Sequence, residues 1–301
     1  MEEDFVRIKA FEKHYYLMLI PGLIWVFIFQ LVPMFGFVIA FQDFNPSKGI
    51  FGSEWVGLEN FTYLFTLNDS KTIFFNTVYI AVLKIIGNLL VPLVAALLLN
   101  EVRIKFIKSS VQTVIYLPHF LSWVILAGIM LDVFSLYGPV NGIRALFGQE
   151  PILFFAQADL FPALIVGSDI WKEYGFNAVI YLAALTGISP ELYEAAAVDG
   201  ANRMQRIWNI TLPGISTTVI LLTVLSLRNV LNANFDQIFT LYNPLVYSTG
   251  DIVDTWVYRM GLLSMQYGLG TAVGLIKSII GFVMIGLAYF LARRFANYNI
   301  F

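Results

Sequence analysis

Ionisable and amide side chains interrupt two of the most apolar stretches of the chain. Asp169, Lys172 and Glu173 lie in one stretch, and Asn229 and Asn232 lie in another. Their spacing of three and four residues places each set on one helical face. Such groups are costly in apolar surroundings and normally face a cavity or a partner. The two faces are therefore candidate binding surfaces.

The chemistry of these faces suits a sugar. Amides and carboxylates exchange hydrogen bonds with hydroxyl groups, and aromatic rings such as Phe176 stack on the apolar faces of pyranoses. The alternative is hydrogen bonding between helices, which amides and charge pairs also provide inside membranes. The residue pattern by itself fits both roles.

The sequence contains no recognisable catalytic or metal-binding motif. It has no cysteine, and its two histidines, His14 and His119, lack the spacing of metal ligands. The nucleotide-binding pattern GxxxxGK[ST] is absent, as are HExxH and GxSxG. A turn and a helix start explain Asp251 and Asp254 better than acid–base chemistry does. We therefore expect no catalytic residues, no metal ligands and no cofactor bound by this chain, and we do not expect an enzyme.

The elements that must position these residues are membrane spans. The 301 residues are 58% hydrophobic and only 13% charged, which is about half the charged fraction of a soluble domain. A span needs about 20 mostly apolar residues. Six stretches qualify: 16–41, 72–99, 111–134, 161–184, 214–238 and 271–292. The prediction is an all-α membrane protein with six transmembrane helices in a single domain, 1–301.

Basic residues indicate the cytosolic side of the membrane. Ten of them fall on one side of the predicted spans: Arg7, Lys9, Lys13, Arg103, Lys105, Lys108, Arg203, Arg206, Arg293 and Arg294. Four fall on the other side: Lys48, Lys71, Arg144 and Arg259. The positive-inside rule then places the N-terminal segment 1–15, both termini and the connection 185–213 in the cytosol. The net charge of −2 and the lack of a basic block argue against a nucleic-acid partner.

A short polar helix is predicted within the connection 185–213. Ser189-Pro190-Glu191 has the pattern of a helix start, with an N-cap, a proline at the first helical position and a carboxylate in the first turn. Leu192 and Tyr193 join the alanines that follow in a narrow apolar strip, and Gly200 fits a helix stop. A capped helix of this kind between two spans is suited to contact another protein.

The sequence around this helix resembles the EAA loop of binding-protein-dependent ABC importer permeases. In that pattern, EAA is followed by three residues, a glycine, nine residues and I-x-L-P. The matching residues here are Glu194, Ala195, Ala196, Gly200, Ile210, Leu212 and Pro213. One departure is that Gly214–Thr218 lacks the second proline that often follows. Further segments look like sugar permeases of the maltose/lipo-oligosaccharide branch, so the resemblance covers nearly the whole chain: Pro21–Leu23, Pro33–Gly36, Val56–Phe61 and Tyr267–Ala272.

The resemblance implies a type I ABC importer permease fold, in which 185–213 is the coupling loop that docks on a cytosolic ATPase. The implied ATPase-coupling residues are Glu194, Ala195, Ala196, Asp199, Gly200, Ala201, Ile210, Leu212 and Pro213. In maltose-type permeases the helices before and after this loop hold the sugar. The implied substrate-binding residues are Asp169, Lys172, Glu173, Phe176, Ser226, Asn229, Val230 and Asn232.

The resemblance also implies partners. These are a second, homologous permease subunit, two ATPase subunits and an extracellular sugar-binding protein, either lipid-anchored or periplasmic, besides membrane lipids. ATP and Mg would bind to the ATPase subunits. The implied function is the movement of an oligosaccharide across the bacterial cytoplasmic membrane by alternating access.

Two other classes of function compete with this interpretation. A gradient-driven secondary sugar transporter would carry an inverted repeat and an ion-coupling carboxylate at mid-depth, for which Asp132 and Asp169 are available. An intramembrane enzyme or a channel would need a catalytic dyad or a filter motif, and the sequence shows neither. None of these explains the EAA-like helix. The sequence leaves open the identity, length and charge of the sugar.

Overall fold

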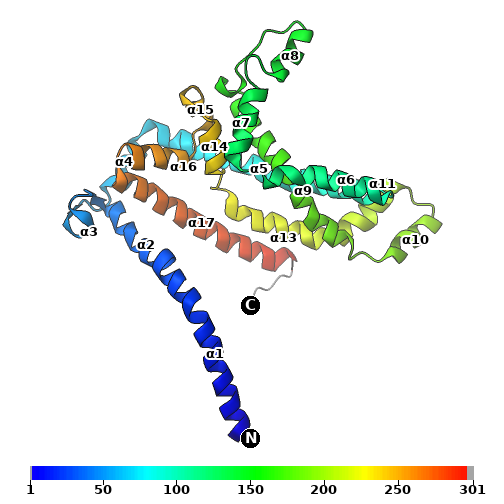
Figure 1. Ribbon diagram of the computed structural model, residues 1–301, viewed down its shortest axis with the longest axis horizontal. Helices are drawn as coiled ribbons and strands as arrows, with labels where there is room; N and C mark the ends of the chain where they lie inside the picture. Colours follow the sequence, from blue (N-terminus) through cyan, green and yellow to red (C-terminus); the bar gives the residue numbers. More distant parts are fainter. Residues whose placement is uncertain (1, 297–301) are drawn as a thin grey trace. The chain divides into compact units, whose positions relative to one another are not determined.

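The computed structural model describes residues 2–296, which are almost entirely helical (Figure 1). The contacts divide the chain into two compact units. Unit 1 comprises Met1–Thr66 and Val257–Leu275, and unit 2 comprises Leu67–Trp256 and Ile276–Phe301. The last helix, α17 (Tyr267–Ala296), contributes residues to both. The prediction of cytosolic termini includes residue 1 and residues 297–301, which lie outside the described residues.

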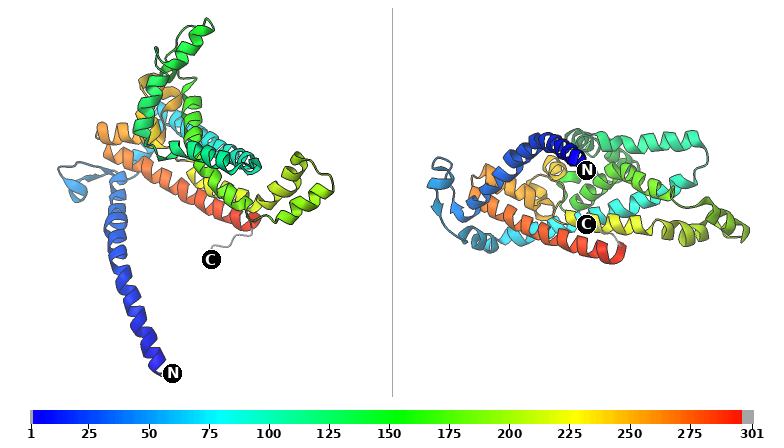
Figure 2. Two further views of the ribbon diagram at one scale, coloured as in Figure 1. Left: turned by 45° about the vertical axis from the view of Figure 1, so that its right-hand side comes forward. Right: turned by 90° about the horizontal axis from the view of Figure 1, so that it is seen from below.

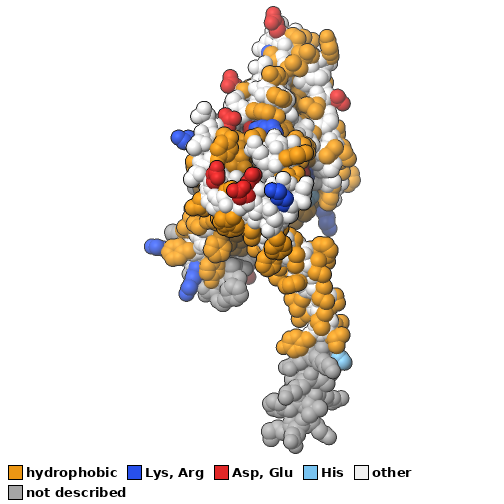
Figure 3. Space-filling model, turned by 90° about the vertical axis from the view of Figure 1, so that its left-hand side faces the viewer, with side chains coloured by type: hydrophobic (Ala, Val, Ile, Leu, Met, Phe, Trp, Pro, Cys, Tyr) orange, Lys and Arg blue, Asp and Glu red, His pale blue; other side chains and the backbone are white. Residues whose placement is uncertain are grey.

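Unit 1 begins with a long helical segment in which an apolar stretch, His14–Phe41, has the length and composition of a membrane span. The segment consists of α1 (Glu2–Val26), the π-helical turn η1 (Phe27–Leu31), α2 (Val32–Met34) and the 3-10 helix η2 (Phe35–Phe41). Large hydrophobic side chains are exposed from Tyr15 to Val38, and Figure 3 shows them as a continuous hydrophobic surface. Lipid is the solvent that such a surface requires.

The rest of unit 1 is a small folded loop region. Its elements are β1 (Gln42–Asp43), α3 (Gly49–Gly52), β2 (Glu54–Trp55), α4 (Glu59–Thr66), η8 (Val257–Leu263) and the start of α17. The two strands pair antiparallel, with Gln42 opposite Trp55. The sequence analysis does not predict this two-stranded sheet. Asn60 holds the start of β1 in place, because its side-chain amide donates hydrogen bonds to the carbonyls of Ala40 and Gln42 at 3.0 and 3.1 Å.

Unit 2 contains the remaining helices. In its first half these are α5 (Asn68–Glu101), α6 (Lys105–Tyr116), η3 (Leu117–Phe120), α7 (Trp123–Val133), α8 (Pro139–Leu146), η4 (Phe154–Ala156) and α9 (Phe161–Leu185). In its second half they are α10 (Pro190–Val198), α11 (Arg203–Arg206), η5 (Ile207–Thr211), α12 (Leu212–Gly214), α13 (Ser216–Ser226), η6 (Leu227–Asn229), α14 (Phe235–Leu241), η7 (Pro244–Val246), α15 (Tyr247–Gly250) and α16 (Val253–Trp256).

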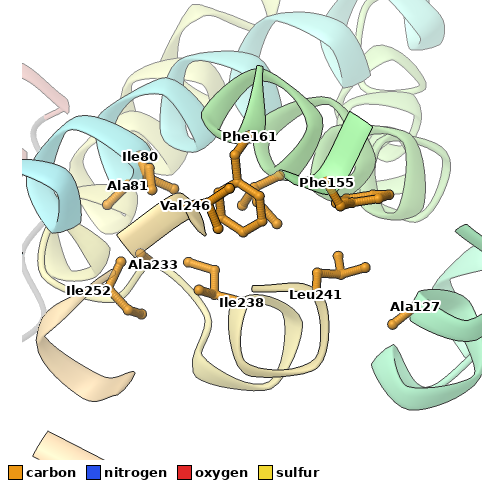
Figure 4. Close-up of a cluster of buried hydrophobic side chains, with 11 residues drawn as sticks. Ile80, Ala81, Ala127, Phe155, Phe161, Ala233, Ile238, Leu241, Val246 and Ile252 are labelled. Carbon is orange, nitrogen blue, oxygen red and sulfur yellow. The ribbon is translucent and has the colours of Figure 1, made fainter. Parts of the chain in front are cut away.

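A buried cluster in unit 2 joins helices that are far apart in the sequence. Figure 4 shows Ile80 and Ala81 of α5, Phe161 of α9 and Ile238 of α14 pointing toward one another. A second cluster lies around Ala96, Ala178 and Tyr181 and holds α5 against α9 along the rest of their length. Burial of these side chains packs α5, α9 and α14 together.

The number of predicted spans agrees with the structure only when two helices joined by a bend are counted as one span. Three stretches among the described residues are long and apolar enough to cross a membrane: His14–Phe41, Asn68–Glu101 and Tyr267–Leu291. Two bent pairs raise this number to five: Lys105–Phe120 with Trp123–Val133, and Arg203–Gly214 with Ser216–Asn229. The remaining prediction, 161–184, corresponds to α9. This helix has 25 residues and so a length of about 37 Å, but it carries three charged side chains within five residues.

Two predicted spans are not continuous helices, and this corrects the sequence analysis. The stretch 111–134 bends by 103°, since Pro118 lies in a 3-10 turn and Ser122 begins a new helix by accepting a hydrogen bond from the Ile125 amide at 3.3 Å. The stretch 214–238 stops at Asn229, and helix resumes only at Phe235. Between these residues the backbone is not helical. The apolar composition of both stretches conceals these breaks.

Candidate functional site

The predicted coupling helix is present as α10, and its end is set by a glycine. Gly200 has a φ of +77°, a conformation that L side chains avoid. The Gly200 amide donates to the Ala197 carbonyl at 3.2 Å, and the Ala201 amide donates to the Ala196 carbonyl at 2.9 Å. These two bonds form a Schellman motif. The predicted stop at Gly200 is confirmed, whereas Ser189 holds the N-cap position without a side-chain hydrogen bond.

The chain turns directly into the next helix and is tied back to α10. Asn202 and Gln205 form a reciprocal capping box at the start of α11, with bonds of 2.8 and 2.9 Å. The Tyr193 hydroxyl lies 3.0 Å from the hydroxyl of Thr211, a buried residue of η5. Figures 1 and 2 show α10 and α11 at the end of unit 2 that lies away from α14 and α15.

The outer surface of this loop combines exposed carboxylates with exposed apolar groups. Glu194, Ala195 and Asp199 are exposed. Val198 is 89% exposed and Leu192 is 53% exposed. Of the other residues that the resemblance implies, Pro213 is exposed, and four are half-buried: Ala196, Ala201, Ile210 and Leu212. An exposed apolar surface in a polar loop is typical of a protein contact.

A cavity of about 710 Å³ lies within unit 2, between α5, α9, α13 and the break before α14. Its polar lining residues are Lys84, Asn88, Asp169, Glu173, Asn177, Tyr181, Ser226, Arg228, Asn229, Asn232, Asn234 and Asp236. Its apolar lining residues are Ala81, Ile85, Leu89, Ile180, Leu222, Leu225 and Phe235. Amides, carboxylates and cations next to an aromatic ring make this cavity able to bind a ligand with many hydroxyl groups.

Five of the eight residues proposed from sequence for substrate binding line this cavity: Asp169, Glu173, Ser226, Asn229 and Asn232. The other three do not line it: Lys172, Phe176 and Val230. Lys172 instead donates a hydrogen bond to a backbone carbonyl, and Phe176 stacks on His119 with ring centroids 4.0 Å apart. The binding role of all eight residues stays a prediction.

Several further polar residues line the cavity that the sequence analysis above does not assign to the site. They are Lys84, Asn88, Asn177, Arg228, Asn234 and Asp236. Lys84 and Asn88 are four residues apart in one apolar span, and this spacing places them on the same helical face. The signal for Asn234 and Asp236 is their position in a stretch whose helix is interrupted.

Lys84 and Asp169 form a buried ion pair at the wall of the cavity. Their charged atoms are 3.2 Å apart, and their side chains are 7% and 9% exposed. The Asn88 amide donates to the second carboxylate oxygen of Asp169 at 2.8 Å, while its own Oδ1 has no partner among the described residues. Lys84 also donates to the backbone carbonyl of Ala233 at 2.8 Å and to the side-chain carbonyl of Gln237.

A second charged cluster lies next to the bend between η3 and α7. The Lys172 ammonium donates to the His119 carbonyl at 2.7 Å and to the Glu173 carboxylate at 3.0 Å. The other Glu173 oxygen lies 2.7 Å from Nδ1 of His119. Lys172 is 5.7 Å from the ring centre of Trp123, within reach of a cation–π contact. Lys84 of α5 and Lys172 of α9 are thus each paired with a carboxylate of α9.

The cavity retains one cation without a partner among the described residues. Arg228 lies in η6, its side chain is exposed, and it makes no ion pair or hydrogen bond there. Within the described residues, no group of three or more histidine, aspartate or glutamate side chains has the geometry of a metal site.

Comparison with known proteins assigns this chain to a family. Residues 88–297 match the model of the binding-protein-dependent transport system inner membrane component. A polygalacturonan/rhamnogalacturonan transport system permease protein of Bacillus subtilis (strain 168) is 41% identical over 291 residues, which cover 96% of this chain and 91% of the relative.

Solved structures agree with this match. The crystal structure of a bacterial ABC transporter involved in the import of the acidic polysaccharide alginate has a chain with a TM-score of 0.89 and 36% identity, covering 97% of this chain and 99% of that one. The alginate transporter in complex with an alginate pentasaccharide-bound periplasmic protein matches with a TM-score of 0.89 and 35% identity over 98% and 99% of the two chains. The type I importer permease fold is confirmed. The chain belongs to the family of binding-protein-dependent transport system inner membrane components.

Proposed function

We propose that this chain is the membrane permease subunit of an ABC importer that moves an oligosaccharide into a bacterial cell by alternating access. The observation that supports the substrate class most strongly is the cavity of unit 2. Its amides and carboxylates are acceptors and donors for sugar hydroxyls, and they gather at a break between helices. The relatives whose names mention polysaccharide transport support the same class.

The coupling loop supports a role for separate ATPase subunits. The sequence carries no nucleotide-binding motif, so the energy for transport must come from a partner that holds ATP and Mg. The exposed carboxylates and apolar groups on either side of Gly200 offer such a partner a surface on the helix end. We propose that two ATPases dock here, with the loop in the cytosol, and that a second permease subunit completes the membrane domain. An extracellular binding protein delivers the sugar.

Acidic oligosaccharides are our preferred substrates. Lys84, which lines the cavity, and Lys172, which was predicted to bind substrate, are both paired with carboxylates. Arg228 has no such partner among the described residues, and a guanidinium binds a carboxylate through two parallel hydrogen bonds. Replacement of Arg228 by Gln should lower uptake of an acidic oligosaccharide by about tenfold and leave a neutral one of equal length less affected. Equal losses for both would remove the argument for acidic substrates.

The experiment that tests the proposed function is uptake by proteoliposomes that contain the complete complex and the binding protein. We expect accumulation of labelled oligosaccharide when ATP is supplied on the ATPase side, and no effect of ionophores. Uptake that persists without ATP and collapses with the ion gradient would support a secondary transporter instead.

A further inference from the structure

The cavity wall between η6 and α14 is a short non-helical segment, residues 231–234, along which burial alternates. Leu231 and Ala233 are buried, at 6% and 0% exposure, whereas Asn232 and Asn234 line the cavity. The amides and the apolar side chains thus face opposite ways along the segment. The segment therefore presents two amides to the cavity only as long as its backbone keeps this orientation. We call this orientation, in which Asn232 and Asn234 face the cavity and Leu231 and Ala233 face away, the register of the segment.

Local sequence does little to keep that register. The segment contains no glycine or proline, and Asn234 adopts a φ of +71°, which is uncommon for residues with a side chain although asparagine tolerates it better than most. Asn232 Oδ1 accepts from the Asn234 amide at 3.3 Å, and Asn234 Oδ1 accepts from the Gln237 amide at 3.4 Å. Both distances are long for hydrogen bonds of this type. Tertiary contacts must supply the remaining restraint.

Lys84 supplies this restraint from the neighbouring helix α5. Its ammonium donates to the carbonyl of Ala233, within the non-helical segment, and to Gln237, in the first turn of α14. Its third donor faces Asp169 at 3.2 Å. An ammonium has three donors, and all three are occupied. Lys84 thus has no donor left for a substrate, although it lines the cavity.

The carbonyl of Ala233 is costly to leave without a donor. It lies in a buried residue at a break in a membrane-spanning region, where a backbone group without a partner is strongly unfavourable. Asp169 compensates the charge of the lysine, and Asn88 holds the carboxylate from the other side at 2.8 Å. Gln237 in turn donates to the Ile165 carbonyl and the Ser168 hydroxyl at 2.7 and 2.8 Å. The network joins α5, α9 and α14 around one backbone carbonyl.

We propose that Lys84 is a positioning residue for the cavity. It acts through the carbonyl of Ala233 and holds segment 231–234 so that Asn232 and Asn234 face the substrate. This inference rests on the proposed function, since it takes the cavity as the substrate site. In this inference, Asp169 neutralises Lys84 and does not bind the sugar.

The test uses the complete reconstituted complex and two matched double variants. Lys84→Met/Asp169→Asn removes the ammonium without leaving a buried charge unpaired. We expect it to assemble normally and to lower uptake by about tenfold or more, because a charge-assisted hydrogen bond to the segment is lost. The control is Lys277→Met/Asp254→Asn, which removes another lysine–aspartate pair of unit 2, at 2.5 Å, that does not line the cavity. Its uptake should stay within about twofold of the wild type, since this half-buried pair lies outside the cavity.

Cysteine labelling separates positioning from general damage, because the chain contains no native cysteine. A cysteine at Asn232 reports the register of the segment, and a cysteine at Ser226 reports the cavity wall formed by α13. In the Lys84→Met/Asp169→Asn background, labelling by a hydrophilic maleimide should fall by about fivefold or more at position 232, a change typical of burial of a reactive group. Labelling at position 226 should stay the same.

Three outcomes would overturn the proposal: wild-type uptake in the double variant, unchanged labelling at position 232, or an equal fall at both positions. The proposed function is checked separately in the otherwise wild-type chain. There, added oligosaccharide should protect the cysteine at position 232. Lack of protection would reject the cavity as the substrate site, whatever Lys84 does to the register.

Discussion

At the scale of single residues, Gly200 ends the coupling helix through its backbone conformation alone. Its φ is +77°, and a Cβ placed on it would meet no other atom within 4 Å. Conformation, and not space, therefore limits substitution. Asparagine tolerates this conformation, whereas a β-branched residue does not.

We expect Gly200→Val to destabilise the end of the coupling helix by about 1–2 kcal/mol and to weaken the stimulation of ATP hydrolysis by loaded binding protein. Gly200→Asn should retain most of that stimulation. The measurement is ATPase activity of the reconstituted complex with and without loaded binding protein. Similar behaviour of the two variants would show that the loop conformation does not matter for coupling.

Asn229 tests whether the polar face after α13 binds substrate or only joins helices. It lines the cavity and makes no side-chain hydrogen bond within the described residues. We expect Asn229→Leu to lower uptake by about tenfold while the ATPase subunits still co-purify. Thr223→Val is the control, since Thr223 lies on α13 away from the cavity and bonds only to the Val219 carbonyl. Normal uptake by Asn229→Leu would assign this face to helix contacts.

The residue pattern predicts much of the polar lining but not its pairing. Asp169, Glu173 and Asn229 are visible in the sequence as polar groups at helical spacing. The contact between Lys84 and Ala233 spans 149 residues, and no local signal connects the two. The pairing decides which charges face a ligand, so it requires the tertiary structure.

At the scale of elements, the close approach of α6 and α9 depends on one glycine. A Cβ on Gly175 would overlap the backbone carbonyl of Ile115, which cannot move aside as a flexible side chain can. Gly167 lies on the same helix with no atom within 4 Å of such a Cβ. Alanine substitution at Gly175 and at Gly167 therefore compares a crowded position with an open position on the same helix.

We expect Gly175→Ala to lower the stability of the purified complex, because overpacking of this kind costs about 1–3 kcal/mol. Gly167→Ala should be neutral or slightly stabilising, since alanine is the better helix former. Thermal unfolding in detergent measures both. A loss of thermal stability in Gly167→Ala that equals the loss in Gly175→Ala would contradict the role assigned to helix contact.

The breaks within the spans mark the limit of prediction for elements. The lengths of α5, α9 and α17 follow from apolar composition, and the coupling helix follows from its proline and its glycine. Segment 231–234 does not follow, because Leu231 and Ala233 continue the apolar pattern of the preceding helix. Only the structure shows that the helix stops there and that Lys84 binds the carbonyl of Ala233.

At the scale of the whole molecule, the family resemblance seen in the sequence is confirmed by a match over residues 88–297 and by relatives that align with nearly the whole chain. The fold and the family role as a transport permease follow from that match. The cavity of unit 2 and the coupling loop give this role two separate physical locations in one unit. In the proposed function, energy enters at the coupling loop and substrate passes through the cavity.

The most direct test of this account is affinity purification of the chain from native membranes, followed by mass spectrometry of the proteins that accompany it. The account predicts a second, homologous permease and an ATPase in stoichiometric amounts. A binding protein should join them when its oligosaccharide is present. A stable chain that purifies alone, or with partners that lack an ATPase, would contradict the account and leave gradient-driven transport as the better explanation.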